Sequence, residues 1–240
     1  MTDDTPTIVL LHGAFAESAS WNGVIPQLKK RSLDVLVAAN PLRSLADDAT
    51  YLRDVITAVG KPVILAGHCY AGMVMTEAAS DNNAVVGLVY VSAFAPDHGE
   101  SALDLTSSAP GSTLGSALRF RALSTGGYEF VIGIDVYQHQ CAADVADDVA
   151  ALMAATQRPV TEDALSAGLP TKTPAWKTIP SWFVFGDNDL SIPVAVHRRG
   201  AQRALSRGTR EVAGASHSIS VSRPDAVVAT ILDAVAELTA

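Results

Sequence analysis

One cysteine in this chain stands where its surroundings favour nucleophilic chemistry. Cys69 is the centre of the segment GHCYAG (67–72), which follows an apolar run typical of a strand and precedes a stretch with helical periodicity. Strand, sharp turn and helix in that order form a nucleophile elbow, in which a strained turn holds the reactive atom above a sheet. Tight backbone packing there requires small residues two positions before and after the nucleophile, and Gly67 and Ala71 supply them. Most free cysteines are small core residues, the interpretation we keep for Cys141; for Cys69 the elbow favours a nucleophile.

A thiol nucleophile needs a base and a group that orients the base. The segment FGDNDLSIP (185–193) follows a later apolar run and offers two acids, Asp187 and Asp189. Its spacing from the glycine and the Ile-Pro pair that follows favour Asp189 as the orienting acid, with Asp187 holding the turn. The alternative is that both acids only cap a loop. His217, in the small-residue loop GASHS (214–218), is the best candidate base by its order and location.

A third motif follows the first apolar run and is suited to stabilising an oxyanion. The turn that begins at His12 and Gly13 resembles those that supply one backbone N–H, while the residue after the nucleophile supplies another. By that rule the donors are the main-chain N–H groups of Ala14 and Tyr70, and His12 holds the turn. Taken alone, the motif is also compatible with an ordinary strand-to-helix turn. The remaining histidines are expected to be structural or bystanders and lack the spacing of metal ligands: His68, His98, His139 and His197.

Alternating strands and helices must position these groups. Nearly continuous apolar runs predict buried strands at 8–11, 33–38, 62–66, 85–91 and 181–185, with a weaker edge strand at 209–212. Helical periodicity covers 21–31, 45–59, 72–80, 194–206 and 224–238. Repeated strand–helix–strand units imply an α/β fold with a mostly parallel sheet and helices on both faces.

One long segment interrupts this alternation. Residues 96–179 contain no strong strand candidate, whereas 141–157 and 161–167 have helical character. A bare loop of that length would be improbable, so we expect an inserted helical cap, with 1–95 and 180–240 forming the core of a single domain. The substrate pocket is expected between the carboxyl edge of the sheet and this cap, with Phe15 and Trp176 among its lining residues.

Composition narrows the function classes. The chain has 240 residues, 48% of them hydrophobic, and a formal net charge of −8, which suits one large core and argues against nucleic acid as a partner. The apolar runs are too short to span a membrane, and the start has no signal-peptide pattern. Two cysteines form neither a disulfide framework nor a metal cluster. We therefore expect a cytoplasmic protein without cofactor or metal that acts on a small molecule, and a homodimer is left open.

Seven short motifs together resemble the α/β-hydrolase superfamily over essentially the whole chain. They are LHGAF (11–15), GHCYAG (67–72), SAFAPD (92–97), QRP (157–159), PAW (174–176), GDND (186–189) and SH (216–217). The chain looks most like the small bacterial esterase-like branch related to plant methylesterases and hydroxynitrile lyases. The resemblance implies the α/β-hydrolase fold and a Ser-His-Asp triad, in which Cys69 here replaces the serine. Dienelactone hydrolases are a precedent in this fold for a Cys-His-Asp triad.

These features predict an acyl hydrolase of the carboxylesterase, lactonase or thioesterase type, or an acyltransferase, working through a covalent acyl-enzyme. Two alternatives stay open. One is a cofactor-free lyase of the hydroxynitrile-lyase type with His217 as base, although the Thr and Lys typical of those enzymes are not clearly placed here. The other is a non-catalytic ligand-binding protein. Two origins also fit Cys69: a native residue, or an engineered replacement of serine in an ordinary esterase.

Overall fold

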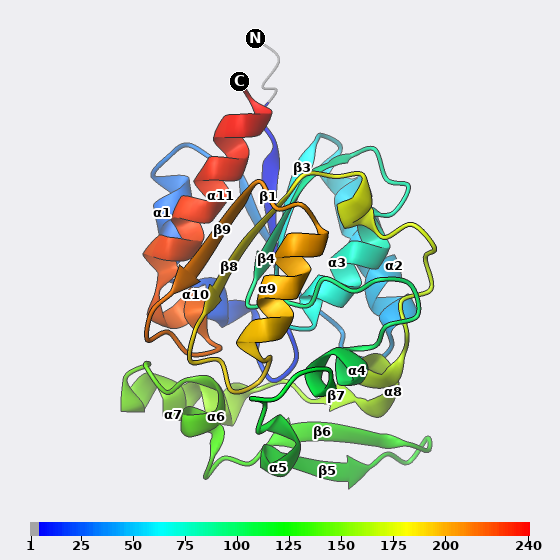
Figure 1. The fold of residues 1–240 in the computed structure, drawn as a ribbon, viewed down its shortest axis with the longest axis vertical. Coiled ribbons are helices and arrows are strands. Elements are labelled where there is room, and N and C mark those ends of the chain that lie inside the picture. The colour runs from blue at the N-terminus through cyan, green and yellow to red at the C-terminus, as the bar shows by residue number, and fades with distance from the viewer. Residues whose placement is uncertain (1–4) are drawn as a thin grey trace.

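A six-stranded sheet forms the centre of the molecule (Figure 1). The structure is a computed structural model that describes residues 5–240; residues 1–4, which belong to the polar start considered above, lie outside the described range. The strand order is β2-β1-β3-β4-β8-β9 and all neighbouring pairs are parallel. The strands are β1 (Thr7–Leu11), β2 (Val35–Ala38), β3 (Val63–His68), β4 (Val85–Val91), β8 (Ser181–Gly186) and β9 (Gly208–Val212). All six predicted strands are therefore confirmed, with β9 at an edge.

Side chains alternate between the two faces of the sheet, and helices cover both. Along β1, Ile8 and Leu10 belong to one buried cluster, and Val9 and Leu11 to the other. Burial on both faces explains why the strands read as nearly continuous apolar runs. The first face packs against α1 (Ile25–Lys29), α10 (Ile219–Ser222) and α11 (Pro224–Leu238). The second packs against α2 (Leu45–Val59), α3 (Ala71–Ala79) and α9 (Val194–Arg203). A short 3-10 helix, η1 (Ser18–Trp21), precedes α1.

Local sequence signals account for the ends of the longest helices. The Ser44 side chain accepts a hydrogen bond from the backbone N–H of Asp47 and so caps the start of α2. Gly60 ends the same helix in a left-handed conformation with φ of 69°. Pro224 occupies the first turn of α11, where its missing N–H has no cost. The predicted ranges 45–59 and 224–238 coincide with these two helices.

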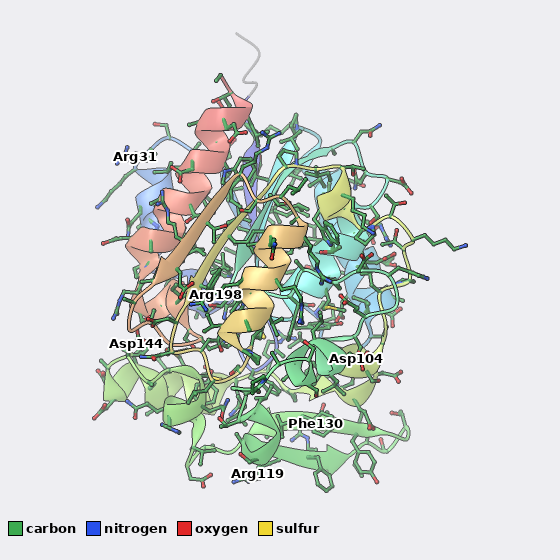
Figure 2. The ribbon with its side chains drawn as sticks, in the orientation of Figure 1. Arg31, Asp104, Arg119, Phe130, Asp144 and Arg198 are labelled. Carbon is green, nitrogen blue, oxygen red and sulfur yellow. The ribbon has the colours of Figure 1, made fainter. Side chains whose placement is uncertain are left out.

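The insertion after β4 is not helical throughout, and in this respect the sequence prediction is wrong. Its helices are α4 (Ala102–Ser107), α5 (Leu114–Ala117), α6 (Tyr137–Cys141), α7 (Asp147–Thr156), α8 (Glu162–Ser166) and the 3-10 helix η2 (Ala175–Lys177). It also contains an antiparallel sheet of β5 (Leu118–Ala122), β6 (Tyr128–Ile132) and β7 (Val160–Thr161). Most of β5 is exposed, so it lacks the apolar run that identifies buried strands. Arg119 and Phe130 mark this hairpin at the end of the molecule away from the core (Figure 2).

The sheet topology brings two loops together. β1 lies between β2 and β3, so the chain reverses its progress across the sheet there, and ligands of open α/β sheets bind at such switch points. Leu11 is paired with Gly67, and the loops that follow β1 and β3 consequently leave the same edge as neighbours. None of the helices within residues 5–240 has the length and apolar character needed to cross a bilayer.

Candidate active site

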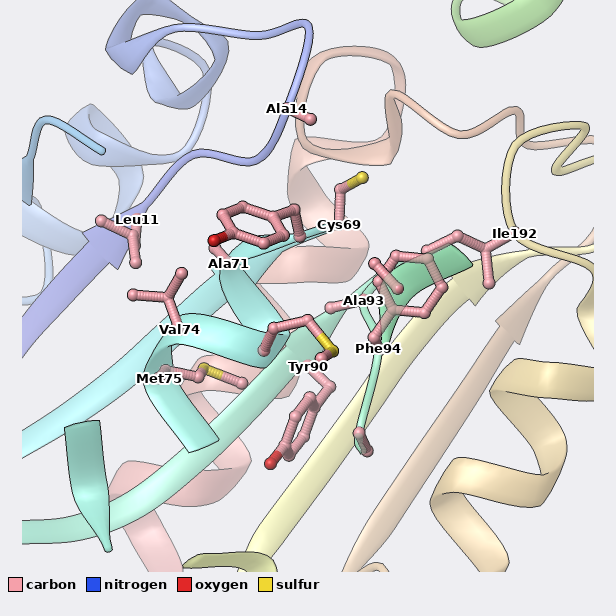
Figure 3. Packing of buried hydrophobic residues seen from close by; sticks show 14 of the residues in the cluster. Leu11, Ala14, Cys69, Ala71, Val74, Met75, Tyr90, Ala93, Phe94 and Ile192 are labelled. Atoms are coloured by element: carbon pink, nitrogen blue, oxygen red, sulfur yellow. The ribbon is translucent and has the colours of Figure 1, made fainter. Parts of the chain in front are cut away.

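Cys69 occupies the turn between β3 and α3 in a strained conformation. Its φ is 56°, in the left-handed region that non-glycine residues rarely adopt. The turn is held from both sides: the N–H of Cys69 donates to the carbonyl of Ser92 at 3.1 Å, and the N–H of Gly72 donates to the carbonyl of Cys69 at 3.0 Å. In Figure 3 the thiol leaves the end of β3 on the side of the loop that carries Ala14. The strained elbow expected from the sequence is confirmed.

The tight packing expected around the elbow is also present. A Cβ added to Gly72 would lie 2.0 Å from the carbonyl oxygen of Phe94, and one added to Gly67 would lie 2.8 Å from the sulfur of Met75. One added to Gly13 would lie 2.5 Å from the Cβ of Cys69 itself. The turn after β1 and the elbow after β3 therefore touch through a position where only hydrogen fits.

His217 and Asp189 form a buried hydrogen-bonded pair. Nδ1 of His217 lies 2.7 Å from Oδ2 of Asp189, and both residues are almost fully buried. The other oxygen of Asp189 accepts the backbone N–H groups of Ser191 and Ile192 at 2.8 and 2.9 Å, which fixes the plane of the carboxylate. Asp187 instead accepts the N–H of Gly214 at 2.7 Å in an exposed turn. Asp189 is therefore the acid that pairs with His217, and Asp187 holds a turn, as the sequence favoured.

The charges of this pair support each other. Burial raises the pKa of Asp189, but the positive charge of His217 and hydrogen bonds from two histidines outweigh it and hold that pKa well below its ordinary value. Burial lowers the pKa of His217, but the charges of Asp189 and Cys69, and hydrogen bonds to both, raise it well above 6.5. His217 can therefore carry a proton in this buried site.

The loop that begins at His12 is fixed so that residue 14 faces the thiol. Nε2 of His12 accepts the N–H of Asn40 at 3.0 Å, so its Nδ1 carries the proton and donates to the carbonyl of Gly13 at 2.9 Å. Burial is the main cause that lowers the pKa of His12 to about 4, which leaves the ring neutral. Within residues 5–240 no hydrogen bond engages the backbone N–H of Ala14 or Tyr70, and both residues line the same cleft as Cys69. These two donors are available to a ligand.

The cap holds the next residue of this loop. The N–H of Phe15 donates to the carbonyl of Arg158 at 3.3 Å, and the hydroxyl of Tyr137 donates to the carbonyl of Phe15 at 2.8 Å. Phe15 itself has a φ of 59°. The loop after β1 is therefore fastened to two separate parts of the cap.

A small apolar cleft of about 30 Å³ lies above the thiol, between the sheet edge and the cap as expected. His217, Phe15 and Phe94 line it from the core side, and Figure 3 shows Phe94 beside Ile192 near Cys69. The cap contributes aliphatic side chains: Ala102, Leu103, Leu114, Leu118 and Leu165.

Trp176 does not line this cleft, which corrects the prediction made for it. Its indole N–H donates to the carbonyl of Pro96 at 2.7 Å, and the ring packs against Lys177 and Arg203 on another side of the molecule. The tryptophan therefore anchors the segment that leaves β4 and has no route to the thiol.

Two histidines expected to be bystanders contact the pair. Nε2 of His68 lies 3.0 Å from the carbonyl oxygen of His217, and burial is the largest cause that lowers the pKa of His68 to about 3. Nε2 of His197 lies 3.0 Å from Oδ2 of Asp189. No sequence signal marks His197, because its contact depends on how the loop after β8 folds back onto α9. No group of three or more His, Cys, Asp or Glu side chains within residues 5–240 is arranged to hold a metal ion.

Cys141 lies close to the pair but has a different character. Its thiol is buried, and burial raises its pKa to about 11 although His217 and a contact with Ser191 oppose this. A thiol of this kind stays protonated at neutral pH. The core interpretation of Cys141 therefore agrees with its environment.

The loop that carries His217 is clasped by the cap segment after α6. The N–H of Ser218 donates to the carbonyl of Cys141 at 2.8 Å, and the Ser216 side chain donates to that carbonyl at 3.1 Å. Asp144 is an alternative acceptor for the single proton of the Ser216 hydroxyl and lies at the junction of cap and core (Figure 2). Contacts from both sides thus place the imidazole.

Comparison with known proteins gives a consistent result. A sequence model described as the Alpha/beta hydrolase family matches residues 8–230. The alpha/beta hydrolase nvfD of Aspergillus novofumigatus is 28% identical over an alignment 254 residues long, which covers 97% of each chain. The structure of polyneuridine aldehyde esterase superposes with a TM-score of 0.81 at 18% identity, over 95% of this chain and 98% of that one. The methylesterase MES16 from Arabidopsis superposes with a TM-score of 0.78 at 16% identity, over 97% of this chain and 99% of that one. At these identities the structural likeness shows a shared fold.

Proposed function

The chain belongs to the alpha/beta hydrolase family, and from that premise we propose that it cleaves ester-type bonds through a covalent acyl intermediate on Cys69. One observation carries the proposal: the thiol on the strained elbow interacts with His217, which in turn is hydrogen-bonded to the buried carboxylate of Asp189. A nucleophile next to a base that is held by an acid is the arrangement that acyl transfer requires.

Each step has a residue suited to it. His217 takes the proton of Cys69, and the thiolate attacks the acyl carbonyl. The oxyanion that forms accepts hydrogen bonds from the N–H groups of Ala14 and Tyr70, which no other group within residues 5–240 engages. His217 then gives its proton to the leaving group, which departs as an alcohol or thiol. The same imidazole takes a proton from water, which attacks the thioester, and the C–S bond breaks to release the acid while His217 returns the proton to the sulfur of Cys69.

The cleft favours an uncharged, apolar substrate of modest size. Apart from the reacting groups and the side chains of Thr106 and Ser191, its walls are aliphatic and aromatic, and no Lys, Arg, Asp or Glu among residues 5–240 lines it. A carboxylate or phosphate near the reacting carbonyl would therefore lose hydration without gaining a partner. Lactones, aryl esters and thioesters with short aliphatic acyl groups satisfy this condition.

The proposal is tested with p-nitrophenyl acetate and an acetyl thioester on matched cysteine variants. Cys69→Ala should abolish hydrolysis, whereas Cys141→Ala should keep most of it, because the Cys141 thiol is protonated and lies outside the reaction path. Intact mass spectrometry after rapid quenching should find one acetyl group on the chain, located on Cys69. Hydrolysis that survives in Cys69→Ala would contradict the proposal.

The same experiments separate the two other functions compatible with the sequence. A lyase that uses His217 as its base would lose activity in His217→Ala but would form no acyl-enzyme. A ligand-binding protein would show neither turnover nor labelling. Replacement of water by an added alcohol or amine as acceptor would identify an acyltransferase from the ratio of products. Cys69→Ser on the same substrates distinguishes the two origins of the cysteine, since a large gain in rate indicates a site shaped for a hydroxyl.

A further inference from the structure

A second histidine shares the acid of the proposed triad. His197 lies in the first half of α9, which packs against β8 (Figure 1), and its side chain is 1% exposed. Its ring stacks on Phe185, with 4.9 Å between ring centres and 15° between planes. Its Nε2 lies 3.0 Å from Oδ2 of Asp189, the oxygen that also bonds His217.

Hydrogen-bond chemistry fixes the role of each ring. An ionised carboxylate only accepts, so Nε2 of His197 must carry a proton and donate it. Nδ1 of His197 is buried and has no hydrogen-bond partner within residues 5–240, so its bond to Asp189 is the contact that orients the ring. The charge of His217 contributes more to holding the carboxylate ionised than that of His197 does. Asp189 thus accepts two imidazole N–H groups on one oxygen, one from His217, the proposed base, and one from His197, which does not line the cleft.

The donor on His197 affects the acid in two ways. Four hydrogen bonds now hold Asp189, two from backbone N–H groups on Oδ1 and two from histidines on Oδ2, so the carboxylate cannot rotate. The bond from His197 also draws negative charge away from Oδ2 and so weakens its attraction for the proton of His217. A general base that must release its proton to a leaving group benefits from that limit.

We propose that His197 is a positioning residue that holds Asp189 in place and limits how strongly the carboxylate retains the proton of His217. The inference rests on the proposed function for its effect on catalysis, but its effect on His217 stands without it. The titratable groups that face His197 are Asp189, His217 and Glu211 of β9, and Glu211 is held by Arg198 at 2.8 Å.

The test compares a variant that keeps the donor with one that lacks it. Gln places an amide N–H near the position of Nε2, whereas Phe keeps the stacking on Phe185 and removes the donor. In His197→Phe the alkaline limb of the kcat/KM profile should move up by about one pH unit, since Asp189 then holds the proton of His217 more strongly. We expect kcat to fall about tenfold with KM nearly unchanged, because His197 does not line the cleft. His197→Gln should restore both properties.

A second readout needs no substrate. Titration of the His217 ring by NMR in protein labelled with ¹⁵N-histidine should show the same upward shift in His197→Phe and its reversal in His197→Gln. If the chain proves not to hydrolyse esters, this titration still decides the role of His197. An unchanged or lowered titration midpoint in His197→Phe, or equal shifts in both variants, would overturn the inference. His197→Met, which matches Gln in length and lacks the donor, replaces Phe if that variant does not fold.

Discussion

Gly13 is the position at which a single added methyl group should uncouple the two halves of the proposed site. A Cβ there would lie 2.5 Å from the Cβ of Cys69 and 2.5 Å from the carbonyl oxygen of His68. Gly13 does not have a positive φ, so alanine is compatible with its backbone conformation and the effect of Gly13→Ala comes from contact alone. The change therefore tests the spacing between the loop after β1 and the elbow.

The size of the effect follows from these distances. Ordinary contacts of a Cβ begin at 3.4 Å, so the two loops must separate by about 0.9 Å to accommodate the methyl group. Phe15 is fastened to Arg158 and Tyr137, so the loop cannot follow as a rigid unit, and the N–H of Ala14 moves relative to the thiol. Misplacement of about 1 Å costs on the order of a hundredfold in rate, and we expect kcat/KM to fall by that factor.

Two assays isolate this cause. Hydrolysis of p-nitrophenyl acetate reports the whole site, whereas alkylation of Cys69 by iodoacetamide needs no oxyanion donor and should change much less. Gly115→Ala is the matched control, because a Cβ there meets no atom of residues 5–240 within 4 Å. A folded Gly13→Ala protein that hydrolyses within about threefold of the unaltered chain would refute the assignment of this loop to the oxyanion site.

Three further changes test other parts of the site. Asp189→Asn should lower kcat by about four orders of magnitude, as in a comparable serine-protease triad, because an amide N–H would face the two histidine N–H groups. Stopped-flow hydrolysis measures this fall in kcat, and a fall of less than about tenfold would contradict the role of Asp189 as the orienting acid. Burial keeps the pKa of His68 at about 3, against 6.5 in the unfolded chain, so the unfolded chain binds a proton first as pH falls. The free energy of unfolding should therefore lose roughly 3 kcal/mol from this residue between neutral pH and about pH 4.5. Urea unfolding measures this loss, which should be absent in His68→Gln. Leu103→Trp should narrow the cleft and lower kcat/KM for hexanoyl but not acetyl esters, and equal losses on both would contradict its place in the wall.

The features that sequence predicts well here are those tied to the backbone. A buried parallel strand must be apolar on both faces, so its position can be read directly from the chain. The elbow needs small residues at fixed offsets from Cys69, and the structure contains the contacts that enforce them. Asp189 follows the buried strand β8 and His217 follows the edge strand β9, and the fold brings them together where these two strands end.

Features that depend on how exposed segments fold were not predictable in this way. β5 alternates arginines with apolar residues and is mostly exposed, so its strand conformation arises from pairing with β6 and leaves no buried pattern. Trp176 is of a residue type that often lines pockets, but the path of the chain after the cap turns its side chain toward Pro96. The contact of His197 with Asp189 spans eight positions and exists only because the intervening loop folds back.

The clasp between Ser216, Ser218 and the segment from Cys141 to Asp144 has a consequence for how the enzyme would admit its substrate. The cap and the loop that carries His217 share these hydrogen bonds, so a movement of this cap segment away from the core would also displace that loop. Easier entry of substrate into the cleft would therefore accompany weaker activation of the Cys69 thiol by His217. In an open molecule, ligands would enter while the base is displaced from the thiol. In a closed molecule, the base would be in place and the bound substrate would be enclosed.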